Sequence, residues 1–318
     1  AVSESGSVWA VIVGSSQYWH NYRHVSNALT MYDAVRSLGV PDSQIVLMLA
    51  GDTPCDARNV APGRVVNARL DGPNLYRPDI EVDYRGAEVT AEAFLRVLTD
   101  TLPADTPASR RLGSGAGSRV LVYLAGHGGD EFFKFQDLHE LASQELADGL
   151  AQIASSRRCK EVLLLVDTCQ AASMMQQLGA APPVLSLASS RTGQNSYSYV
   201  TDHALGVALS DRFTFHLHRF VMWHHQHKGR AAPPTVGDAV GALSPRLLNS
   251  HVQLGAHGAG RTVADAAALP LIRYFAQPAP PLATVAPLAA AATAVAAAVI
   301  ATAAAAAACA GEGLRPRM

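Results

Sequence analysis

Two residues that could act together in catalysis, His127 and Cys169, each follow a long apolar run of the sequence. The first run belongs to the stretch 119–129 and the second to the stretch 161–170. A cysteine thiolate attacks carbonyl carbons, and a nearby imidazole can remove the thiol proton and later protonate the departing group. If the two runs are neighbouring strands, imidazole and thiol can lie within hydrogen-bond reach, about 3 Å. The two residues therefore predict a cysteine nucleophile and its base.

The glycines around His127 strengthen this interpretation. An uninterrupted run of Val and Leu is typical of a strand buried on both faces of a parallel sheet, whose functional groups lie just beyond the strand's carboxyl end. A lone cysteine there is often only a small buried side chain, and a lone histidine only a polar filler. Here both runs end in the same way, and Gly126, Gly128 and Gly129 let the backbone approach a substrate closely. This coincidence favours catalysis.

The remaining sequence alternates strand and helix patterns. Gly39 and Pro41 are expected to end the first helix, and Thr90 can cap the second. Strands are expected at residues 8–14, 44–50, 119–125, 161–167 and 184–188, and helices at 25–38, 90–102, 138–153 and 203–225. Residues 51–78 and 103–118 have no usable period and are expected to form a loop and a linker. This alternation predicts an α/β sandwich with a mainly parallel sheet.

Charge and cysteine content exclude several classes of protein. The chain of 318 residues carries 25 basic and 26 acidic residues, so no basic field indicates a nucleic-acid partner. Four cysteines without regular spacing form neither a disulfide framework nor a zinc pattern. We therefore expect no nucleic-acid binding and no zinc site.

Residues 282–310 differ sharply from the rest of the chain. They contain no charged residue and are dominated by alanine, and the stretch is long enough to span a hydrocarbon core, which needs roughly 20 apolar residues. Arg315 and Arg317, in the short tail 311–318, favour a cytoplasmic C-terminus. We expect a single transmembrane helix at 282–310; the alternative is a low-complexity, partly helical tail.

Several motifs together resemble one family. Residues 126–129 and 167–170, with Asn-Tyr-Arg-His at 21–24, resemble the legumain-type clan of caspase-like cysteine peptidases. Within that clan, Asp-Thr-Cys-Gln at 167–170 resembles the catalytic subunits of GPI-anchor transamidases, whereas legumain has a Glu-Ala-Cys setting. The resemblance runs from about residue 9 to residue 275 and implies a caspase-like α/β/α sandwich. We accordingly place a catalytic domain at 1–250 and a C-terminal extension and linker at 251–281.

The resemblance implies a thioester mechanism. Cys169 would cleave the C-terminal attachment signal of a proprotein, and the ethanolamine amine of a GPI lipid would attack the thioester to give an amide. The backbone N–H groups of Gly128 and Cys169 would stabilise the oxyanion. Asn21 matches a family residue near the catalytic histidine; a turn residue before a helix is the alternative. Two other functions stay open: a legumain-like asparaginyl endopeptidase and a non-catalytic scaffold subunit.

Five residues are candidates for binding the substrate. By resemblance, Arg23, Asp167 and Asp211 line the pocket for the residue before the cleaved bond, although Asp211 could equally be a solvated helix charge. Ser189 and Ser190 follow the strand at 184–188, next to the expected site. We therefore expect all five to lie near Cys169.

Acidic residues elsewhere match a calcium site of the resembling family. Asp42, Glu81 and Asp83, with the Ile45 carbonyl, would supply the hard oxygen ligands that suit calcium. Glu81 and Asp83 fall on one face of an extended segment, and a solvated acidic edge is the alternative. The ion would be structural, because the expected chemistry needs no metal or other cofactor.

The resemblance also implies partners and a location. Cys55, in a polar loop, matches the family cysteine that forms a disulfide with a partner subunit, whereas Cys159 and Cys309 are expected to be unpaired. The chain would act with other transamidase subunits at the endoplasmic reticulum membrane, with its catalytic domain in the oxidising lumen. A luminal protein needs a targeting segment, so we expect the full gene to encode a cleavable apolar segment before Ala1.

Overall fold

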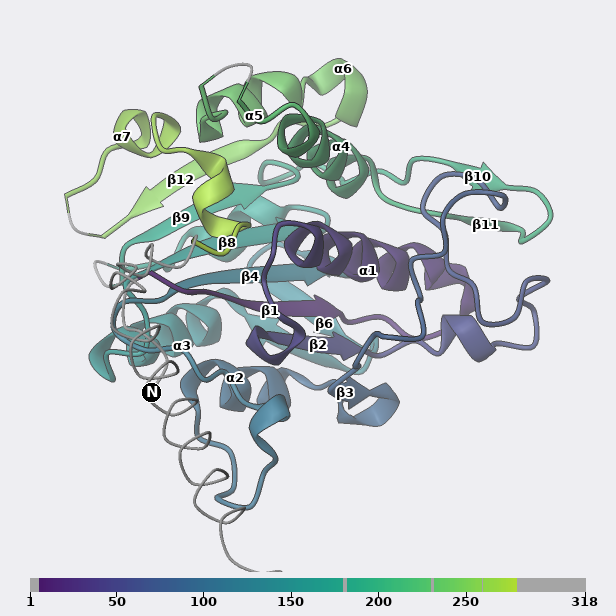
Figure 1. Cartoon of the computed structure of the whole chain (residues 1–318), viewed down its shortest axis with the longest axis horizontal. Coiled ribbons are helices and arrows are strands. Elements are labelled where there is room, and N and C mark those ends of the chain that lie inside the picture. The colour runs from purple at the N-terminus through teal and green to yellow at the C-terminus, as the bar shows by residue number, and fades with distance from the viewer. Residues whose placement is uncertain (1–5, 180–181, 230–231, 259, 279–318) are drawn as a thin grey trace, which may run out of the picture. The chain divides into compact units, whose positions relative to one another are not determined.

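A seven-stranded sheet forms the centre of the protein (Figure 1). The computed structural model describes residues 6–179, 182–229, 232–258 and 260–278. Within them the strand order is β12-β9-β8-β4-β1-β2-β3, and all neighbours are parallel except β12 and β9. The strands are β1 (Val8–Gly14), β2 (Ile45–Leu49), β3 (Tyr84–Arg85), β4 (Arg119–Ala125), β8 (Glu161–Asp167), β9 (Val184–Ala188) and β12 (Gln253–His257).

Helices cover both faces of the sheet. The helices α1 (Tyr22–Ser37) and α4 (Arg212–Gln226) pack on one face, and α2 (Ala91–Thr99) and α3 (Ser143–Ser155) pack on the other (Figure 1). Successive residues of a strand point to opposite faces, so β1 contributes to both hydrophobic cores. The residues Val8, Ala10 and Ile12 pack on the α1 side, and Trp9, Val11 and Val13 pack on the α2 side.

Shorter elements complete the fold. Three short strands form a second sheet beside the carboxyl end of β4: β5 (Gly128–Gly129), β6 (Phe132–Phe135) and β7 (His139–Ala142). A hairpin precedes α4, formed by β10 (Thr201–Asp202) and β11 (Val207–Ala208). The helices α5 (Val236–Ala242), α6 (Pro245–Leu248) and α7 (Val263–Ala267) follow α4.

The predicted mixed α/β fold with a mainly parallel sheet is confirmed. The strands at 8–14, 119–125, 161–167 and 184–188 have the predicted bounds, and β2 begins and ends within one residue of them. Thr90 caps α2 as expected, because its Oγ1 accepts a hydrogen bond from Ala93 N at 3.0 Å. Between residues 51 and 78 the structure has a single 3-10 turn, η3 (Thr53–Cys55), which agrees with the predicted loop.

Two predicted helices begin too early. Residues 139–142 form β7 instead of the first turn of a helix, because Gln136 and Asp137 have φ of 55° and 59° and turn the chain back onto β6. The helix expected at 203–225 begins only at Arg212. Asp202 Oδ1 accepts hydrogen bonds from the N–H groups of Ala204 and Leu205, and these bonds close the β10–β11 turn before the helix. Apolar spacing alone does not reveal these local turns.

The main sheet continues beyond residue 250, where we placed the end of the catalytic domain. The edge strand β12 pairs with β9 in antiparallel register, and Tyr274 and Phe275 are buried in the core on the α1 side. Among the described residues, no helix is both long and apolar enough to cross a bilayer. The transmembrane helix expected at 282–310 and the tail 311–318 lie outside the described residues.

Candidate active site

The two predicted catalytic residues follow neighbouring strands at the same level. Ala125, the last residue of β4, pairs with Asp167, the last residue of β8. His127 lies two residues beyond the first strand end and Cys169 two residues beyond the second. Both therefore emerge at the carboxyl edge of the sheet, where α/β proteins bind their ligands. We call His127, Cys169 and the residues that contact them the catalytic edge.

Cys169 lies in a turn whose backbone is hydrogen-bonded on both sides of it. The Thr168 N–H donates to Ser189 Oγ at 3.2 Å, and Gln170, in the left-handed region with φ of 53°, donates its N–H to Gln194 O at 2.7 Å. Among the described residues, by contrast, no acceptor bonds the backbone N–H of Cys169. A free N–H at the nucleophile is available to an oxyanion that forms beside it.

Ser189 and Ser190 support this turn. Both side chains are fully buried, and their Oγ atoms donate to the Thr168 carbonyl at 3.1 and 2.9 Å. Ser190 Oγ also accepts a hydrogen bond from Ala171 N at 3.1 Å. We predicted that the two serines line the substrate pocket; the structure shows their hydroxyl groups hydrogen-bonded to the backbone around Cys169. They can therefore fix the orientation of the nucleophile.

His127 is oriented by Asn21. The ring Nε2 lies 2.8 Å from Asn21 Oδ1, and Asn21 Nδ2 donates to Gln17 O at 2.8 Å. A carboxamide oxygen only accepts hydrogen bonds, so Nε2 carries the proton of the neutral ring and Nδ1 carries its lone pair. The basic atom of His127 is therefore Nδ1. Asn21 is also the residue that precedes α1, so the position that we predicted and its turn alternative are both compatible with the structure.

His127 and Cys169 do not hydrogen-bond to each other. Among the described residues, the contact of Cys169 Sγ is a long one, 4.0 Å to Ser196 O. The strands are neighbours as expected, and the reach of about 3 Å that they allow is not used for a hydrogen bond between the two side chains here. Catalytic contacts of this kind commonly shorten only when a substrate binds between the two groups.

The environment keeps His127 neutral. Burial lowers the pKa of His127 below its ordinary value, and the positive charge of Arg23 lowers it further. The ring of His24 packs edge-on against it with centroids 4.9 Å apart and an interplanar angle of 82°, and burial holds the pKa of His24 well below its ordinary value. His24 is itself fixed by a 2.8 Å hydrogen bond between its Nδ1 and Ser16 Oγ. At neutral pH, His127 is thus ready to accept a proton.

Arg23 and Asp211 form an ion pair beside the histidines. Arg23 Nε lies 3.2 Å from Asp211 Oδ1, and Asn27 Nδ2 donates to Asp211 Oδ2 at 2.6 Å. Asp211 is buried, so it is not a solvated helix charge. Burial, together with the charge of Asp167, raises the pKa of Asp211 to about 7. This pair gives the catalytic edge a guanidinium and a carboxylate that can recognise a polar substrate group.

Asp167 is a second buried carboxylate under the same edge. Its two oxygens accept hydrogen bonds from Ser196 Oγ at 2.8 Å and from Thr214 Oγ1 at 2.6 Å. Burial raises its pKa, although these hydroxyl groups oppose the change. Because both oxygens are occupied, Asp167 is positioned to hold the Ser196 segment and its carbonyl beside Cys169.

Gly128 occupies a position that no larger residue fits. A Cβ atom there would lie 2.7 Å from the Phe132 carbonyl oxygen and 2.7 Å from Thr168 Oγ1. Real Cβ atoms essentially never approach backbone oxygens so closely, so the His127 loop and the Cys169 turn would have to separate. The backbone of Gly128 thus packs directly against Thr168, the residue that precedes the nucleophile.

Sequence reasoning missed three residues that support the dyad: His24, Asn27 and Ser196. A signal exists for the first two, because they are three residues apart and share one face of α1 with Arg23 nearby. Ser196 lies in an irregular segment between β9 and β10, where no periodicity indicates which side chains point inward.

Two of the expected calcium ligands lie next to β2: Asp42 precedes the strand, and Asp83 lies beside Leu47 within it. Asp42 accepts a hydrogen bond from Tyr32 OH, and Asp83 Oδ2 accepts one from Leu47 N at 2.8 Å. Burial raises the pKa of Asp83 to about 7, with further contributions from the charges of Glu81 and Asp42. A cation would relieve this repulsion, and carboxylates suit calcium. Within the described ranges, however, no group of three or more His, Cys, Asp or Glu side chains has the spacing of a metal site.

The other cysteines lie away from the catalytic edge. Cys55 is exposed on η3, where another chain can reach it, and Cys159 is buried. Burial raises the pKa of Cys159 to about 11, which leaves its thiol unreactive at neutral pH. Cys309 lies outside the described residues.

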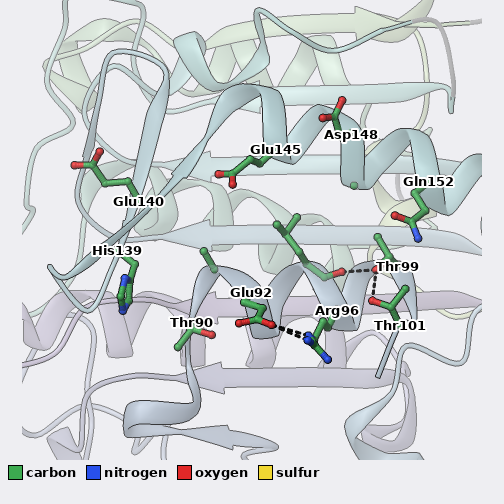
Figure 2. Close-up of a pocket in the computed structure, with 13 residues that line it drawn as sticks. Thr90, Glu92, Arg96, Thr99, Thr101, His139, Glu140, Glu145, Asp148 and Gln152 are labelled. Atoms are coloured by element: carbon green, nitrogen blue, oxygen red, sulfur yellow. Dashed lines mark hydrogen bonds and ion pairs between the residues drawn. The ribbon is translucent and has the colours of Figure 1, made fainter. Parts of the chain in front are cut away.

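A hollow of about 640 Å³ between α2 and α3 is separate from this site. Figure 2 shows its acidic side chains Glu140, Glu145 and Asp148, and the ion pair between Glu92 and Arg96 at 2.7 Å. None of its lining residues belongs to the catalytic edge. The hollow therefore plays no part in the chemistry of the dyad.

Fold and site together define an α/β protein of the cysteine-peptidase type, with the nucleophile and its base at adjacent strand ends. The sequence profile of the Peptidase C13 family matches residues 8–257, and the chain belongs to that family.

Curated relatives carry a more specific name. The GPI-anchor transamidase of Schizosaccharomyces pombe is 44% identical over 250 residues, covering 79% of this chain and 65% of the relative. The enzyme of the same name from Mus musculus is 49% identical over 213 residues (67% and 54%), and that from Saccharomyces cerevisiae is 42% identical over 244 residues (77% and 58%). The aligned part thus spans between about half and two thirds of the length of these relatives.

Proposed function

We propose that this chain is the catalytic subunit of a GPI transamidase. The observation that carries the proposal is the similarity to GPI-anchor transamidases over two thirds or more of the chain, in a protein whose Cys169 and His127 lie at adjacent strand ends. The free N–H of Cys169 and the fixed tautomer of His127 supply the two further requirements of acyl transfer, an oxyanion donor and a base.

The first half-reaction cleaves the proprotein. His127 Nδ1 takes the proton of the Cys169 thiol, and the thiolate attacks the carbonyl carbon of the attachment residue. The N–H groups of Cys169 and Gly128 bind the resulting oxyanion. When the intermediate collapses, the C–N bond breaks and His127 gives its proton to the departing amine of the signal peptide. The product is a thioester on Cys169.

The second half-reaction transfers the acyl group. The ethanolamine amine of a GPI lipid attacks the thioester carbonyl and gives a proton to His127, the C–S bond breaks, and the proton returns to the Cys169 sulfur. The result is an amide, with no net change in protons on the enzyme. Arg23 and Asp211 contribute to the pocket for the residue before the cleaved bond, and the buried Asp167 supports that pocket from below.

The same proposal includes the chain's surroundings. The domain faces the lumen of the endoplasmic reticulum, residues 282–310 form a single membrane span, and the C-terminus is cytoplasmic. Cys55 forms a disulfide with a partner subunit, which its exposure supports. A structural calcium ion binds near Asp42, the Ile45 carbonyl, Glu81 and Asp83, and it takes no part in catalysis.

Complementation tests the function. The chain, preceded by a signal peptide, is expressed in cells that lack the transamidase catalytic subunit, and GPI-anchored protein at the surface is measured. We expect rescue by the parent chain and by Cys159→Ala, whose thiol is inert, but no rescue by Cys169→Ala at equal protein level. Rescue by Cys169→Ala would remove that residue from the chemistry.

If neither the parent chain nor the two variants rescue the cells, experiments on the isolated protein distinguish the explanations. Labelling of Cys169 by a thiol-reactive substrate analogue would show a competent nucleophile that the foreign partner subunits do not accept. Turnover of an Asn-specific peptide would instead support an endopeptidase, and an unreactive Cys169 would support a scaffold.

A further inference from the structure

The described domain ends near the amino ends of the strands of the main sheet, whereas the catalytic edge lies at their carboxyl ends. Gln277 Oε1 accepts a hydrogen bond from the N–H of Val8, the first residue of β1, at 2.8 Å. Cys169, in contrast, follows the last residue of β8. In the sequence, the uncharged stretch 282–310 begins four residues after Pro278. The chain therefore leaves the domain toward its most apolar stretch from the amino ends of the strands, which we call the exit edge.

An apolar groove opens beside the exit edge. It has a volume of about 450 Å³, and its apolar lining includes Trp223, Pro233, Pro234 and Ile272. Gln277 and three histidines, His224, His225 and His227, also line it. Trp223 is 55% exposed, whereas Trp9 and Trp19 are buried. A large exposed indole beside an apolar groove is typical of surfaces that contact a partner or a membrane interface.

Cations gather next to this groove. Arg119 and Arg261 lie 2.9 and 3.4 Å from the single buried carboxylate of Glu161, and Arg273 also contacts it. Arg273 follows Ile272 in the 3-10 turn η7 (Leu271–Tyr274), so the cluster and the groove adjoin. Three guanidinium groups around one carboxylate leave two positive charges in excess.

Further charges extend this pattern. Lys228 lines the groove, and Lys160 immediately precedes Glu161 at the same end of β8. Carboxylates lie here as well. Asp238 and Asp265 are hydrogen-bonded by the helix-capping residues Thr235 and Thr262, and Asp42 lies two residues before Gln44, whose side chain accepts a hydrogen bond from Gln277 Nε2 at 2.8 Å. The five cations named here thus outnumber the four carboxylates of Glu161, Asp238, Asp265 and Asp42 by one, whereas the chain as a whole has a net charge of −1.

We infer that the exit edge is a membrane-binding surface. Trp223 and the apolar groove enter the interfacial layer of the bilayer, and the cations around them contact the phosphates of lipid headgroups. This inference rests on the membrane attachment included in the proposed function, and it adds the orientation of the catalytic domain. Gln277 lines the groove, and the uncharged stretch 282–310 begins five residues later in the sequence, which favours a bilayer over a soluble protein as the occupant of the groove.

The orientation constrains the lipid substrate. A strand rises about 3.3 Å per residue, so a seven-residue strand such as β8 separates the two edges by about 23 Å. With the exit edge on the membrane and the strands along the membrane normal, Cys169 lies about this far from the bilayer. The amine that attacks the thioester must therefore be carried at the tip of a long headgroup, and a short amino-phospholipid headgroup cannot reach it.

The test uses the full chain reconstituted in phosphatidylcholine vesicles with increasing phosphatidylserine, prepared with ordinary or brominated lipids. Bromine on the acyl chains quenches a tryptophan that enters the interface. We expect brominated lipid to quench the tryptophan fluorescence of the parent protein. In Trp223→Phe this quenching should disappear, because the other two tryptophans are buried.

Lys228→Gln should lower the ratio of docked to undocked protein about fivefold, which is the contribution of one cation near an anionic leaflet. Arg191→Gln, which removes an exposed cation just after the carboxyl end of β9, should leave the ratio unchanged.

The outcomes separate this inference from the proposed function. Vesicle flotation shows whether the chain is membrane-bound, and complementation reports catalysis separately. A chain that floats but is quenched equally in the parent and in Trp223→Phe would overturn the inference and leave the groove for a partner protein. A chain that neither floats nor is quenched would overturn it as well. Quenching that does not increase with the phosphatidylserine content of the vesicles would contradict the role of the cations.

Discussion

The Nε2 atom of His127 donates a hydrogen bond to Asn21 Oδ1 at 2.8 Å, between residues 106 positions apart in the sequence. This contact determines which nitrogen of the ring is the base, because it keeps the proton on Nε2 and leaves the lone pair on Nδ1. The dyad therefore depends on the segment that joins β1 to α1 as well as on the ends of β4 and β8.

Replacing Asn21 by alanine should slow acyl transfer by about 100-fold, the usual effect of a catalytic group displaced by about 1 Å. Asn21→Asp should restore the orientation but raise the pKa of His127, because a carboxylate stabilises the imidazolium. The pH–rate profiles of the two variants separate these effects. Similar thermal unfolding of all three proteins would exclude a folding defect, and an unchanged rate in Asn21→Ala would contradict the proposed role.

The acid limb of the pH–rate profile should lie below pH 6.5, the ordinary value for histidine, because burial and then Arg23 lower the pKa of His127. Activity requires the neutral ring, so it is lost as the pH falls through this lowered value. Arg23→Gln removes the largest charge contribution to this lowering and should move the acid limb to higher pH. A limb that stays in place or moves to lower pH in this variant would show that Arg23 does not act on His127 through its charge.

Gly128→Ala should abolish most of the activity and lower the free energy of unfolding by about 1–3 kcal/mol, the typical cost of forcing extra atoms into a packed site. The added Cβ would lie 2.7 Å from the Phe132 carbonyl oxygen. Gly115→Ala is the matched control, because a Cβ there meets nothing within 4 Å. Denaturant unfolding and acyl-transfer assays on both variants are the measurement. Equal activity of the two would contradict the close packing at Gly128.

The sequence allowed the central strands and the identity of the dyad to be predicted because two separate signals agree there. Val and Leu run uninterrupted through β4 and β8, and each strand is followed at the same distance by a reactive side chain, His127 or Cys169. The parallel register then brings the two residues to one edge. No long-range information beyond the pairing of these strands is needed.

Other features could not be predicted, because they depend on contacts that leave no periodic trace. The antiparallel edge strand β12 contains Gly255 and His257 and does not resemble an apolar run. The commitment of Ser189 and Ser190 to the Thr168 carbonyl depends on where the chain after β9 passes the Cys169 turn. The direction of the His127 ring depends on Asn21, which is distant in sequence.

Calcium should raise the melting temperature if it binds as proposed. Burial and the charges of Glu81 and Asp42 raise the pKa of Asp83 to about 7, so the three carboxylates repel one another in the absence of a cation. At a concentration of 100 times Kd, a ligand that binds only the folded state stabilises it by about 2.7 kcal/mol. Thermal unfolding in calcium and in EGTA measures this, with Glu81→Gln expected to reduce the response. Identical melting temperatures in calcium and in EGTA would contradict the site.

Glu161 should be the most sensitive charge for stability. Burial raises its pKa, but Arg273, Tyr274 and Arg119 outweigh burial and leave the pKa below its ordinary value. Its carboxylate is almost fully buried among three arginines, so Glu161→Gln should lower the free energy of unfolding at pH 7 by about 3–5 kcal/mol. Glu92→Gln is the control, because the exposed ion pair of Glu92 with Arg96 contributes at most about 0.5 kcal/mol.

The pH dependence of this loss has a defined sign. A carboxylate whose pKa is lowered by folding contributes its full stabilisation above its unfolded pKa, and the contribution disappears as the pH falls through the lower folded value. The difference in unfolding free energy between the parent and Glu161→Gln should therefore be largest near neutral pH and shrink in acid. Urea unfolding at several pH values measures it. A difference that grows as the pH falls would mean that burial, and not the arginines, dominates the energetics of Glu161.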